Sequence, residues 1–442
     1  MVERLENIRR FQGDVEQCMK CGFCGYFCPI YREQRDEKAL ARGKDELIRF
    51  ALEGRQSLTP GFYRVIDNCL LCKTCVQYCP AKTRTDHAVT AARADYAAQQ
   101  GLPLAKRFVF RHLLPRRRLF GVALRLASWL QCLLPRRAGR FRHLPQFVSA
   151  LGAGRVVPDI APRFLRQTLS ERTAPASRAR YRVGFFAGCA TEYVYPEIGQ
   201  MIVDILRDLG CEVVFDRRQG CCGAPVYFSG DFRTGRQLAA RNVAALQDYD
   251  YVVTGCATCS SALREYPTYL AESPEERERY ERFAAKVQDF NAFVIDVLAA
   301  APQQLLVTPR FQGRTVTWHD PCHLARYQDV RAQPRQILQS LAGIRFVEMP
   351  DADRCCGLGG SYSITHYETS QQIADHKVDA ILACGADTVA TACPGCIIQL
   401  RDALTRRHVA VDVAHIGELF TVTPAHTVAG GSGWAERDKV ES

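Results

Sequence analysis

Eight cysteines near the start of the chain fall into two runs with the same spacing, C-x2-C-x2-C-x3-C-P. The first run is Cys18, Cys21, Cys24 and Cys28, and the second is Cys69, Cys72, Cys75 and Cys79. Such a run binds a [4Fe–4S] cube, and where two runs occur together the fourth cysteine of each binds the other cube. We therefore predict one cube on Cys18, Cys21, Cys24 and Cys79, and a second on Cys69, Cys72, Cys75 and Cys28. Structural zinc sites prefer two C-x2-C pairs, which leaves two Cys-Pro ends unexplained.

A second cysteine pattern occurs twice in the rest of the chain. A lone cysteine is followed 32 or 33 positions later by Cys-Cys-Gly, and a C-x2-C pair comes a further 34 or 37 positions on. The two sets are Cys189, Cys221, Cys222, Cys256 and Cys259, and Cys322, Cys355, Cys356, Cys393 and Cys396. Five thiolates exceed what one zinc ion or one cube needs, so each set predicts a larger, multinuclear site. Gly223 and Gly357 would let the backbone pass close to it.

Three of the 21 cysteines belong to neither pattern. Cys132, Cys211 and Cys384 stand in apolar surroundings, which favours small buried side chains over metal ligands. His319 and His323 flank Cys322 and have no counterparts beside Cys189. They could donate hydrogen bonds to a cluster or couple a proton to its reduction, but structural loop histidines are the favoured interpretation.

Strands and helices alternate in the second half of the chain and must position these cysteines. The elements expected in the first copy lie at 183–189, 196–210, 211–215 and 251–259. Their counterparts in the second copy lie at 316–322, 334–343, 344–349 and 387–396. This alternation predicts a small parallel sheet in each copy, with the cysteines at the carboxyl ends of strands, where open α/β sheets hold their ligands.

We therefore predict a multidomain protein of mixed α and α/β class. It begins with a helical ferredoxin domain carrying the two [4Fe–4S] motifs, over residues 1–95, and a basic helical linker over 96–180. A pseudo-repeat of two small parallel-sheet domains follows, over 181–313 and 314–422. Residues 423–442 are expected to form a disordered tail.

The net charge of +11 is concentrated in the linker. Between Tyr96 and Pro158 there are twelve Lys and Arg residues and no Asp or Glu, so the rest of the chain has 46 basic and 47 acidic residues, a net charge of −1. This local basicity does not favour nucleic-acid binding, because no base-reading module accompanies it.

Within the linker, residues 119–134 are mostly apolar and have arginines on both sides. Sixteen residues make a helix of about 24 Å, which is shorter than the roughly 30 Å hydrocarbon core of a bilayer. Such a helix favours contact of residues 106–142 with an anionic membrane surface. Docking on a partner subunit and burial as an ordinary helix stay alternatives.

The start of the chain, MVERLENIRR, lacks the apolar core of a secretory signal, and thiols in metal-binding patterns are typical of a reducing compartment. We therefore expect a cytoplasmic location. Because of the basic linker, peripheral contact with the cytoplasmic face of the inner membrane is a further alternative.

Both five-cysteine sets resemble the CCG, or cysteine-rich, domain of heterodisulfide reductase. Following two cube motifs, they make residues 10–422 similar to the iron–sulfur subunits of glycolate oxidase, lactate-utilisation dehydrogenases and anaerobic glycerol-3-phosphate dehydrogenase. HDPCHL (319–324) and CCGLGGSY (355–362) are most similar to the glycolate oxidase branch, and ATEYVYPEIG (190–199) to the lactate-utilisation branch. The resemblance implies that one or both five-cysteine sets hold a non-cubane [4Fe–4S] cluster, with a cube or zinc as alternatives.

The resemblance further implies an electron-transfer subunit of a glycolate or lactate dehydrogenase complex. A FAD-containing partner would oxidise the substrate, and this chain would relay electrons to a quinone or another membrane-linked acceptor. No flavin or nicotinamide site of its own is expected, because no glycine-rich stretch opens a helix after a strand. The alternatives are a heterodisulfide reductase-like catalytic subunit, which reduces a disulfide at a non-cubane cluster, and a structural zinc module. No catalytic residue is predicted.

Overall fold

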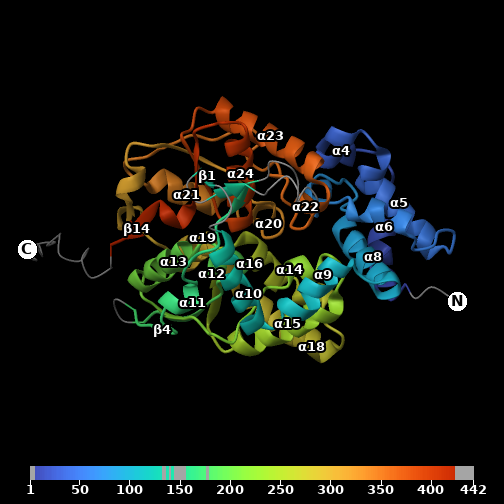
Figure 1. The fold of residues 1–442 in the computed structure, drawn as a ribbon, viewed down its shortest axis with the longest axis horizontal. Coiled ribbons are helices and arrows are strands. Elements are labelled where there is room, and N and C mark those ends of the chain that lie inside the picture. The colour runs from blue at the N-terminus through green and yellow to red at the C-terminus, as the bar shows by residue number, and fades with distance from the viewer. Residues whose placement is uncertain (1–4, 132–135, 139–140, 144–155, 176–178, 424–442) are drawn as a thin grey trace, which may run out of the picture.

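The computed structural model describes residues 5–131, 136–138, 141–143, 156–175 and 179–423, and within residues 5–100 its regular elements are all helices (Figure 1). They are α1 (Glu6–Arg10), α2 (Gln12–Glu16), α3 (Cys24–Phe27), α4 (Pro29–Gln34), the 3-10 turn η1 (Glu37–Ala39), α5 (Ala41–Leu52), α6 (Pro60–Asp67), α7 (Thr74–Gln77) and α8 (Thr85–Gln100). Ile8, Ile48, Ile66 and Val89 are fully buried in their shared core. The predicted helical class of this part is confirmed.

A carboxylate on α8 holds the start of α1. Asp95 accepts hydrogen bonds from the backbone N–H groups of Asn7 and Ile8, at 3.1 and 2.8 Å. The first N–H groups of a helix have no partner within the helix, so Asp95 caps α1 from a neighbouring helix. These two hydrogen bonds join the beginning and the end of the helical part.

The first α/β part contains a sheet in the strand order β4-β6-β5-β7-β8. Its strands are β4 (Arg172–Thr173), β5 (Tyr181–Phe185), β6 (Cys211–Val214), β7 (Tyr251–Thr254) and β8 (Val287–Asp289), all parallel except β4. The longer helices around it are α13 (Pro196–Asp208), α15 (Phe232–Leu246), α16 (Ala257–Arg264) and α18 (Pro274–Lys286). The parallel sheet follows the prediction.

The second α/β part repeats this topology, with the strand order β11-β10-β12-β13 and parallel pairing throughout. Its strands are β10 (Thr315–Trp318), β11 (Arg345–Phe346), β12 (Thr388–Thr391) and β13 (Asp412–His415), and its longer helices are α21 (Ala332–Ser340), α23 (Tyr367–Ala383) and α24 (Pro394–Arg406). Since β6-β5-β7-β8 and β11-β10-β12-β13 correspond strand for strand, the predicted pseudo-repeat is confirmed. The strand predicted over 344–349 is shorter: β11 is an edge strand that pairs only with β10, and this pairing ends with the hydrogen bond from the Val347 N–H to the Val316 carbonyl at 2.9 Å.

The linker forms two helical segments and a small sheet. The helical segments are α9 (Leu104–Phe108), which continues into the π-helical turn η2 (Val109–Leu113), and α10 (Arg117–Leu130). Three short antiparallel strands follow, β1 (Arg136–Ala138), β2 (Phe141–His143) and β3 (Val156–Pro158), which the sequence did not predict. The helix expected over 119–134 corresponds to α10, and residues 132–135 and 424–442 lie outside the described part.

The helical part packs against both α/β parts through the second cysteine run. Tyr327 of the second α/β part donates a hydrogen bond to the carbonyl of Leu71 at 2.7 Å. Arg93 of α8 donates to the carbonyls of Cys69 and Phe228, at 2.8 and 2.9 Å. The backbones meet at Gly230 (φ 98°), where a Cβ atom would lie 2.3 Å from the carbonyl oxygen of Arg93.

We expect Gly230→Ala to loosen this contact. The left-handed backbone alone costs an alanine about 1–3 kcal/mol, and the clash is with backbone that cannot swing aside. The variant should therefore unfold at lower urea concentration than the wild type, followed by tryptophan fluorescence. Gly13→Ala in α2 is the control, since its added Cβ meets nothing within 4 Å. Equal unfolding midpoints for Gly230→Ala and the wild type would contradict the close approach.

Candidate metal centres

The eight cysteines of the two runs line two adjacent pockets in the helical part. Cys18, Cys21, Cys24 and Cys79 line one pocket, Cys28, Cys69 and Cys72 line the other, and Cys75 lines both. The fourth cysteine of each run therefore lies with the first three of the other run. Crossed ligation requires this arrangement, and the ligation itself stays a prediction.

The backbone of the two runs turns in the same way. Lys20 and Gly22 in the first run, and Leu71 and Lys73 in the second, all have positive φ values, between 52° and 80°. They occupy matching positions, two and four residues after the first cysteine. Left-handed backbone is uncommon for residues other than glycine and is often found at functional sites. Here it turns each run so that its first three cysteines line one pocket.

Buried positive charge lies beside the second pocket. The ammonium group of Lys44 is buried, donates a hydrogen bond to the carbonyl of Lys38 at 3.0 Å, and lies near Cys28. Burial raises the pKa of the Cys28 thiol to about 11, and the charge of Lys44 partly opposes this shift. A metal would take the place of the thiol proton, because thiolates are the binding form.

The first five-cysteine set gathers where three neighbouring strands end. Cys189 follows β5, Cys221 and Cys222 follow β6, and Cys256 and Cys259 follow β7. Thiol hydrogen bonds join Cys189 to Cys221, Cys221 to Cys222, Cys222 to Cys259, and Cys259 to Cys256. All five sulfurs thus belong to one connected group.

The second set repeats this arrangement after β10, β11 and β12. Thiol contacts join Cys322 to Cys355, Cys355 to Cys356, and Cys393 to Cys396. The Sγ atoms of Cys356 and Cys396 lie 3.6 Å apart. The structure therefore brings together all five cysteines of each predicted set.

In each Cys-Cys-Gly motif, the glycine N–H forms a hydrogen bond with the sulfur of the first cysteine. The backbone N–H of Gly223 donates to Cys221 Sγ and that of Gly357 to Cys355 Sγ, both at 3.4 Å. Gly223 has a φ of 83° and Gly357 a φ of 90°, and a Cβ on Gly357 would lie 2.6 Å from the carbonyl oxygen of Ser370. Only glycine fits this turn without strain.

The sulfur groups also touch one another across the boundaries between the three parts. A thiol hydrogen bond from Cys355 lowers the pKa of Cys72 to about 6, which joins the helical part to the second set. Another joins Cys256 to Cys393, and hence the first set to the second. With Cys75 lining both pockets of the helical part, the cysteines form one row through the molecule. Sequence reasoning missed this row, because spacing along the chain carries no signal of contacts between domains.

The two histidines beside Cys322 have different surroundings. His323 has an Oγ–Nδ1 hydrogen bond with Ser261 at 2.7 Å, and its ring stacks on Tyr327 with centroids 4.2 Å apart. His319 is fully buried, and within the described part of the chain neither ring nitrogen is hydrogen-bonded to an oxygen or nitrogen atom, while the imidazole interacts with the Cys356 thiol. One ring nitrogen of His319, Cys356 Sγ and Cys396 Sγ lie within 4.8 Å of one another.

The three remaining cysteines lie apart from these groups or outside the described residues. Cys211 is fully buried in β6, as predicted. Cys384 is only half-buried, contrary to the prediction, because it lies at the C-terminal end of α23, where it donates a hydrogen bond to the carbonyl of Ile381 at 3.1 Å. Cys132 lies outside the described residues.

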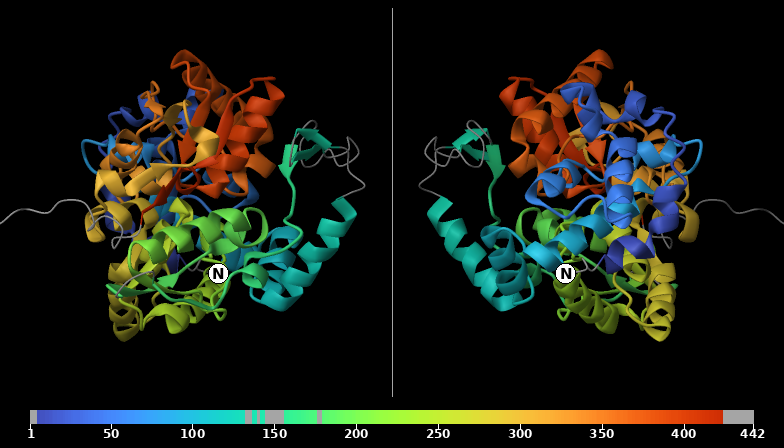
Figure 2. Two further views of the ribbon diagram at one scale, coloured as in Figure 1. Left: turned by 90° about the vertical axis from the view of Figure 1, so that its left-hand side faces the viewer. Right: turned by 90° about the vertical axis from the view of Figure 1, so that its right-hand side faces the viewer.

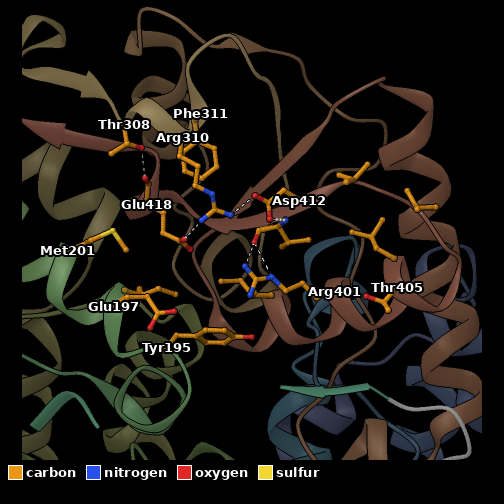
Figure 3. A pocket seen from close by; sticks show the side chains of 16 residues that line it. Tyr195, Glu197, Met201, Thr308, Arg310, Phe311, Arg401, Thr405, Asp412 and Glu418 are labelled. Atoms are coloured by element: carbon orange, nitrogen blue, oxygen red, sulfur yellow. Dashed lines mark hydrogen bonds and ion pairs between the residues drawn. The ribbon is translucent and has the colours of Figure 1, made fainter. Parts of the chain in front are cut away.

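A pocket of about 590 Å³ lies between the two α/β parts (Figure 3). Arg310 forms an ion pair with Glu418 at 3.3 Å, and Arg401 donates a hydrogen bond to the carbonyl of Val413 at 3.1 Å. The lining groups are therefore largely paired with one another. None of the sixteen lining residues is a cysteine.

Helix α10 lies on the outside of the molecule beside the first α/β part (Figure 2). Its exposed apolar side chains are Leu119, Val122, Leu126, Trp129 and Leu130, with exposed fractions from 45% to 70%. Their spacing places them on one face of the helix. On its inner side, Arg117 and Phe120 line a small pocket together with Cys189 and Cys221. Across the described residues, no helix has the length and apolar character needed to cross a bilayer.

These donor sets fit iron–sulfur clusters. Eighteen cysteines gather in four groups at neighbouring sites, and thiolates are the ligands that such clusters use. His319 adds a buried nitrogen donor that faces the sulfurs of the second five-cysteine set. A single zinc ion in any of the five-cysteine groups would leave at least one thiolate unused.

Comparison with known protein families agrees with this description. Residues 183–264 and 316–401 each match the family described as "Cysteine-rich domain", and residues 14–83 match the "4Fe-4S dicluster domain". The matched ranges contain all eighteen patterned cysteines. The chain is therefore an iron–sulfur protein with two cysteine-rich domains.

Curated relatives are similar to this chain over most of its length or over about half of it. The "Probable glycolate oxidase iron-sulfur subunit" of Bacillus subtilis is 31% identical over 434 residues, which are 95% of this chain and 96% of that protein. "Lactate utilization protein A" of Geobacillus kaustophilus is 33% identical over 239 residues, 54% of this chain and 98% of that protein. The protein of the same description from Bacillus subtilis is 31% identical over the same length. The chain, in which a 4Fe-4S dicluster domain precedes two cysteine-rich domains, belongs to the family of the glycolate oxidase iron–sulfur subunit.

Proposed function

We propose that this chain is the electron-transfer subunit of a flavin-dependent 2-hydroxyacid dehydrogenase complex that oxidises glycolate or lactate. It accepts electrons from a FAD-containing partner and passes them to a quinone or another membrane-linked acceptor. The observation that carries the proposal is the continuous row of cysteines from the helical part through both cysteine-rich domains. The descriptions of the relatives support the choice of substrate class.

In this proposal the chain holds two [4Fe–4S] cubes and one or two non-cubane [4Fe–4S] clusters. The cubes are bound by the crossed sets of the helical part, and each cysteine-rich domain offers its five cysteines. The bound clusters supply one-electron carriers. The protein supplies their spacing, their burial and the neighbouring charges, which set the reduction potentials.

The contacts between groups suggest the order of the relay. Electron tunnelling slows steeply with distance, so each site exchanges electrons with the site whose ligands it touches. Cys72 touches Cys355 of the second cysteine-rich domain, and Cys393 of that domain touches Cys256 of the first. The relay therefore runs from the cubes to the second cysteine-rich domain and then to the first, against the order of the two domains in the chain.

A disulfide-reducing catalytic subunit is less well supported. Such an enzyme needs a substrate pocket that reaches a cluster. The pocket at Cys189 and Cys221 has room for about 20 Å³, which is about the space of one water molecule. The large pocket between the α/β parts is not lined by cysteine. These observations favour the relay.

The far end of the relay lies under α10, whose outer face suits an anionic membrane surface. Arg116, Arg118 and Arg125 are exposed around its apolar face, and no acidic residue occurs between Tyr96 and Pro158. A basic amphipathic helix of this kind lies in the plane of an anionic membrane. We propose that α10 places the first cysteine-rich domain close to a membrane-bound acceptor.

The crossed ligation predicts which cysteine variants act on the same cube. Cys79→Ser and Cys21→Ser should each damage one cube, and their double variant should lose no more cube signal than either alone. Cys79→Ser combined with Cys72→Ser should damage both cubes. Electron paramagnetic resonance of the reduced protein measures this, with Cys384→Ser as a control that keeps both cubes. Loss of both cubes in the Cys21/Cys79 double variant would mean that each run binds its own cube.

The subunit assignment predicts that the isolated chain has no substrate turnover. Oxidation of a 2-hydroxyacid transfers a hydride, which needs a flavin or nicotinamide. Purified chain mixed with lactate or glycolate and an artificial acceptor should therefore show no activity. Adding the partner flavoprotein with substrate should reduce the clusters, seen as bleaching of their visible absorption. Turnover by flavin-free chain alone would overturn the assignment, as would clusters that stay oxidised in the complete mixture.

Membrane docking predicts salt-sensitive binding to anionic vesicles. Each arginine near the surface contributes about 1 kcal/mol, so Arg116→Gln with Arg118→Gln should weaken binding by about thirtyfold. The exposed pair Arg64→Gln with Arg233→Gln is the control and should bind like the wild type. Trp129→Ser should weaken binding at high salt as well, because apolar contact is not screened. Equal sedimentation with anionic and neutral vesicles would instead indicate docking of α10 on a partner subunit.

A further inference from the structure

The buried imidazole of His319 faces the sulfurs of the second cysteine-rich site and has no oxygen or nitrogen hydrogen-bond partner in the described part of the chain. The side chain is fully buried, neither ring nitrogen is hydrogen-bonded to an oxygen or nitrogen atom, and the imidazole interacts with the Cys356 thiol. Buried polar side chains are nearly always hydrogen-bonded, so an unsatisfied one requires an explanation. One ring nitrogen lies within 4.8 Å of Cys356 Sγ and Cys396 Sγ, two sulfurs of the second cysteine-rich site.

Other histidines near the sites do not share this property. His323 is bonded to Ser261, and the fully buried His415 has its Nε2 2.7 Å from the carbonyl oxygen of Gly255. The Nδ1 atom of His415 accepts a hydrogen bond from the backbone N–H of Gly417 at 3.1 Å. The fold therefore supplies these two imidazoles with oxygen or backbone N–H partners, whereas the imidazole of His319 faces sulfur.

The pseudo-repeat identifies the counterpart of His319 in the first copy. The backbone N–H of His319 donates to the carbonyl of Ala390 at 3.0 Å, and that of Phe186 donates to the carbonyl of Val253 at 2.9 Å. Each residue lies three positions before the first cysteine of its set and just beyond its central strand. Phe186 is also fully buried. The same place in the fold thus holds an apolar ring in one copy and an imidazole in the other.

We propose that His319 is a nitrogen ligand to the metal held by the second cysteine-rich site, beside Cys356 and Cys396. The first site, with Phe186 in the equivalent position, is then ligated by cysteine alone. Imidazole is a common metal ligand and binds in its neutral form, so it brings less negative charge than a thiolate. Histidine in place of cysteine raises the potential of an iron–sulfur centre. The second site should therefore be reduced at a higher potential than the first.

This inference rests on the proposed function, since it assumes that the second site holds metal. It deepens that function by making the two cysteine-rich sites chemically different. In the proposed relay the second site lies between the cubes and the first site. Its ligands would then set the potential at which electrons pass between them.

The test uses the full chain, prepared without oxygen and labelled with ¹⁵N-histidine. Pulsed electron paramagnetic resonance of the reduced protein should show one strongly coupled histidine nitrogen. The coupling should disappear in His319→Phe, which installs the residue of the first copy, and persist in the control His323→Phe. If the site holds zinc, X-ray absorption should show a nitrogen neighbour at about 2.0 Å that His319→Phe removes.

Each outcome of this experiment decides whether His319 is a metal ligand. Retained cube signals show that His319→Phe is folded, and His319→Cys should keep the metal while lowering the potential of the second site. No strongly coupled nitrogen in metal-loaded wild type, or the same coupling in His319→Phe, would overturn the inference. Such a result would leave the proposed relay intact if the partner flavoprotein still reduces the clusters. Failure of that reduction, with the nitrogen coupling present, would count against the proposed function alone.

Discussion

The contact between Cys72 and Cys355 is the interaction on which the rest of the arrangement depends. It joins a cysteine pocket of the helical part to the second five-cysteine set across the boundary between two domains. Beside it, the buried ammonium of Lys73 forms ion pairs with Glu265 at 2.7 Å and Asp86 at 3.3 Å, and lies over the ring of Tyr327. A buried charge is strongly destabilising without its partners, so this network favours one relative position of the three parts. The distance between neighbouring sites is thereby fixed.

Each cysteine-rich domain brings its five cysteines together in the same way, at one edge of a parallel sheet. Cysteines that end three adjacent parallel strands meet at one edge, although they are more than thirty residues apart in the chain. The copies are joined where these edges meet. The backbone N–H of Ala257, next to Cys256, donates to the carbonyl of Ala392, next to Cys393, at 3.0 Å. A hydrogen bond between main chains thus holds the two ligand sets together.

The copies differ in what surrounds them. The second lies against the cysteine pockets of the helical part, and a buried imidazole faces its sulfurs. The first lies under α10, with an apolar ring at the equivalent position and basic and apolar residues on the outer surface. A repeated fold with different neighbours provides an inner and an outer site, which suits a directional relay.

The sequence by itself determined the metal chemistry and the fold class of this protein. Cysteine spacing identifies ligand sets because a short run, or the ends of adjacent strands, brings thiols together by local geometry. The alternation of strands and helices predicted both parallel sheets for the same reason. Only the tertiary structure decided how the sites follow one another, since Cys72 and Cys355 are 283 residues apart and no periodicity links them. It also separated His319 from His323, because burial and hydrogen bonding depend on side chains brought together from distant parts of the chain.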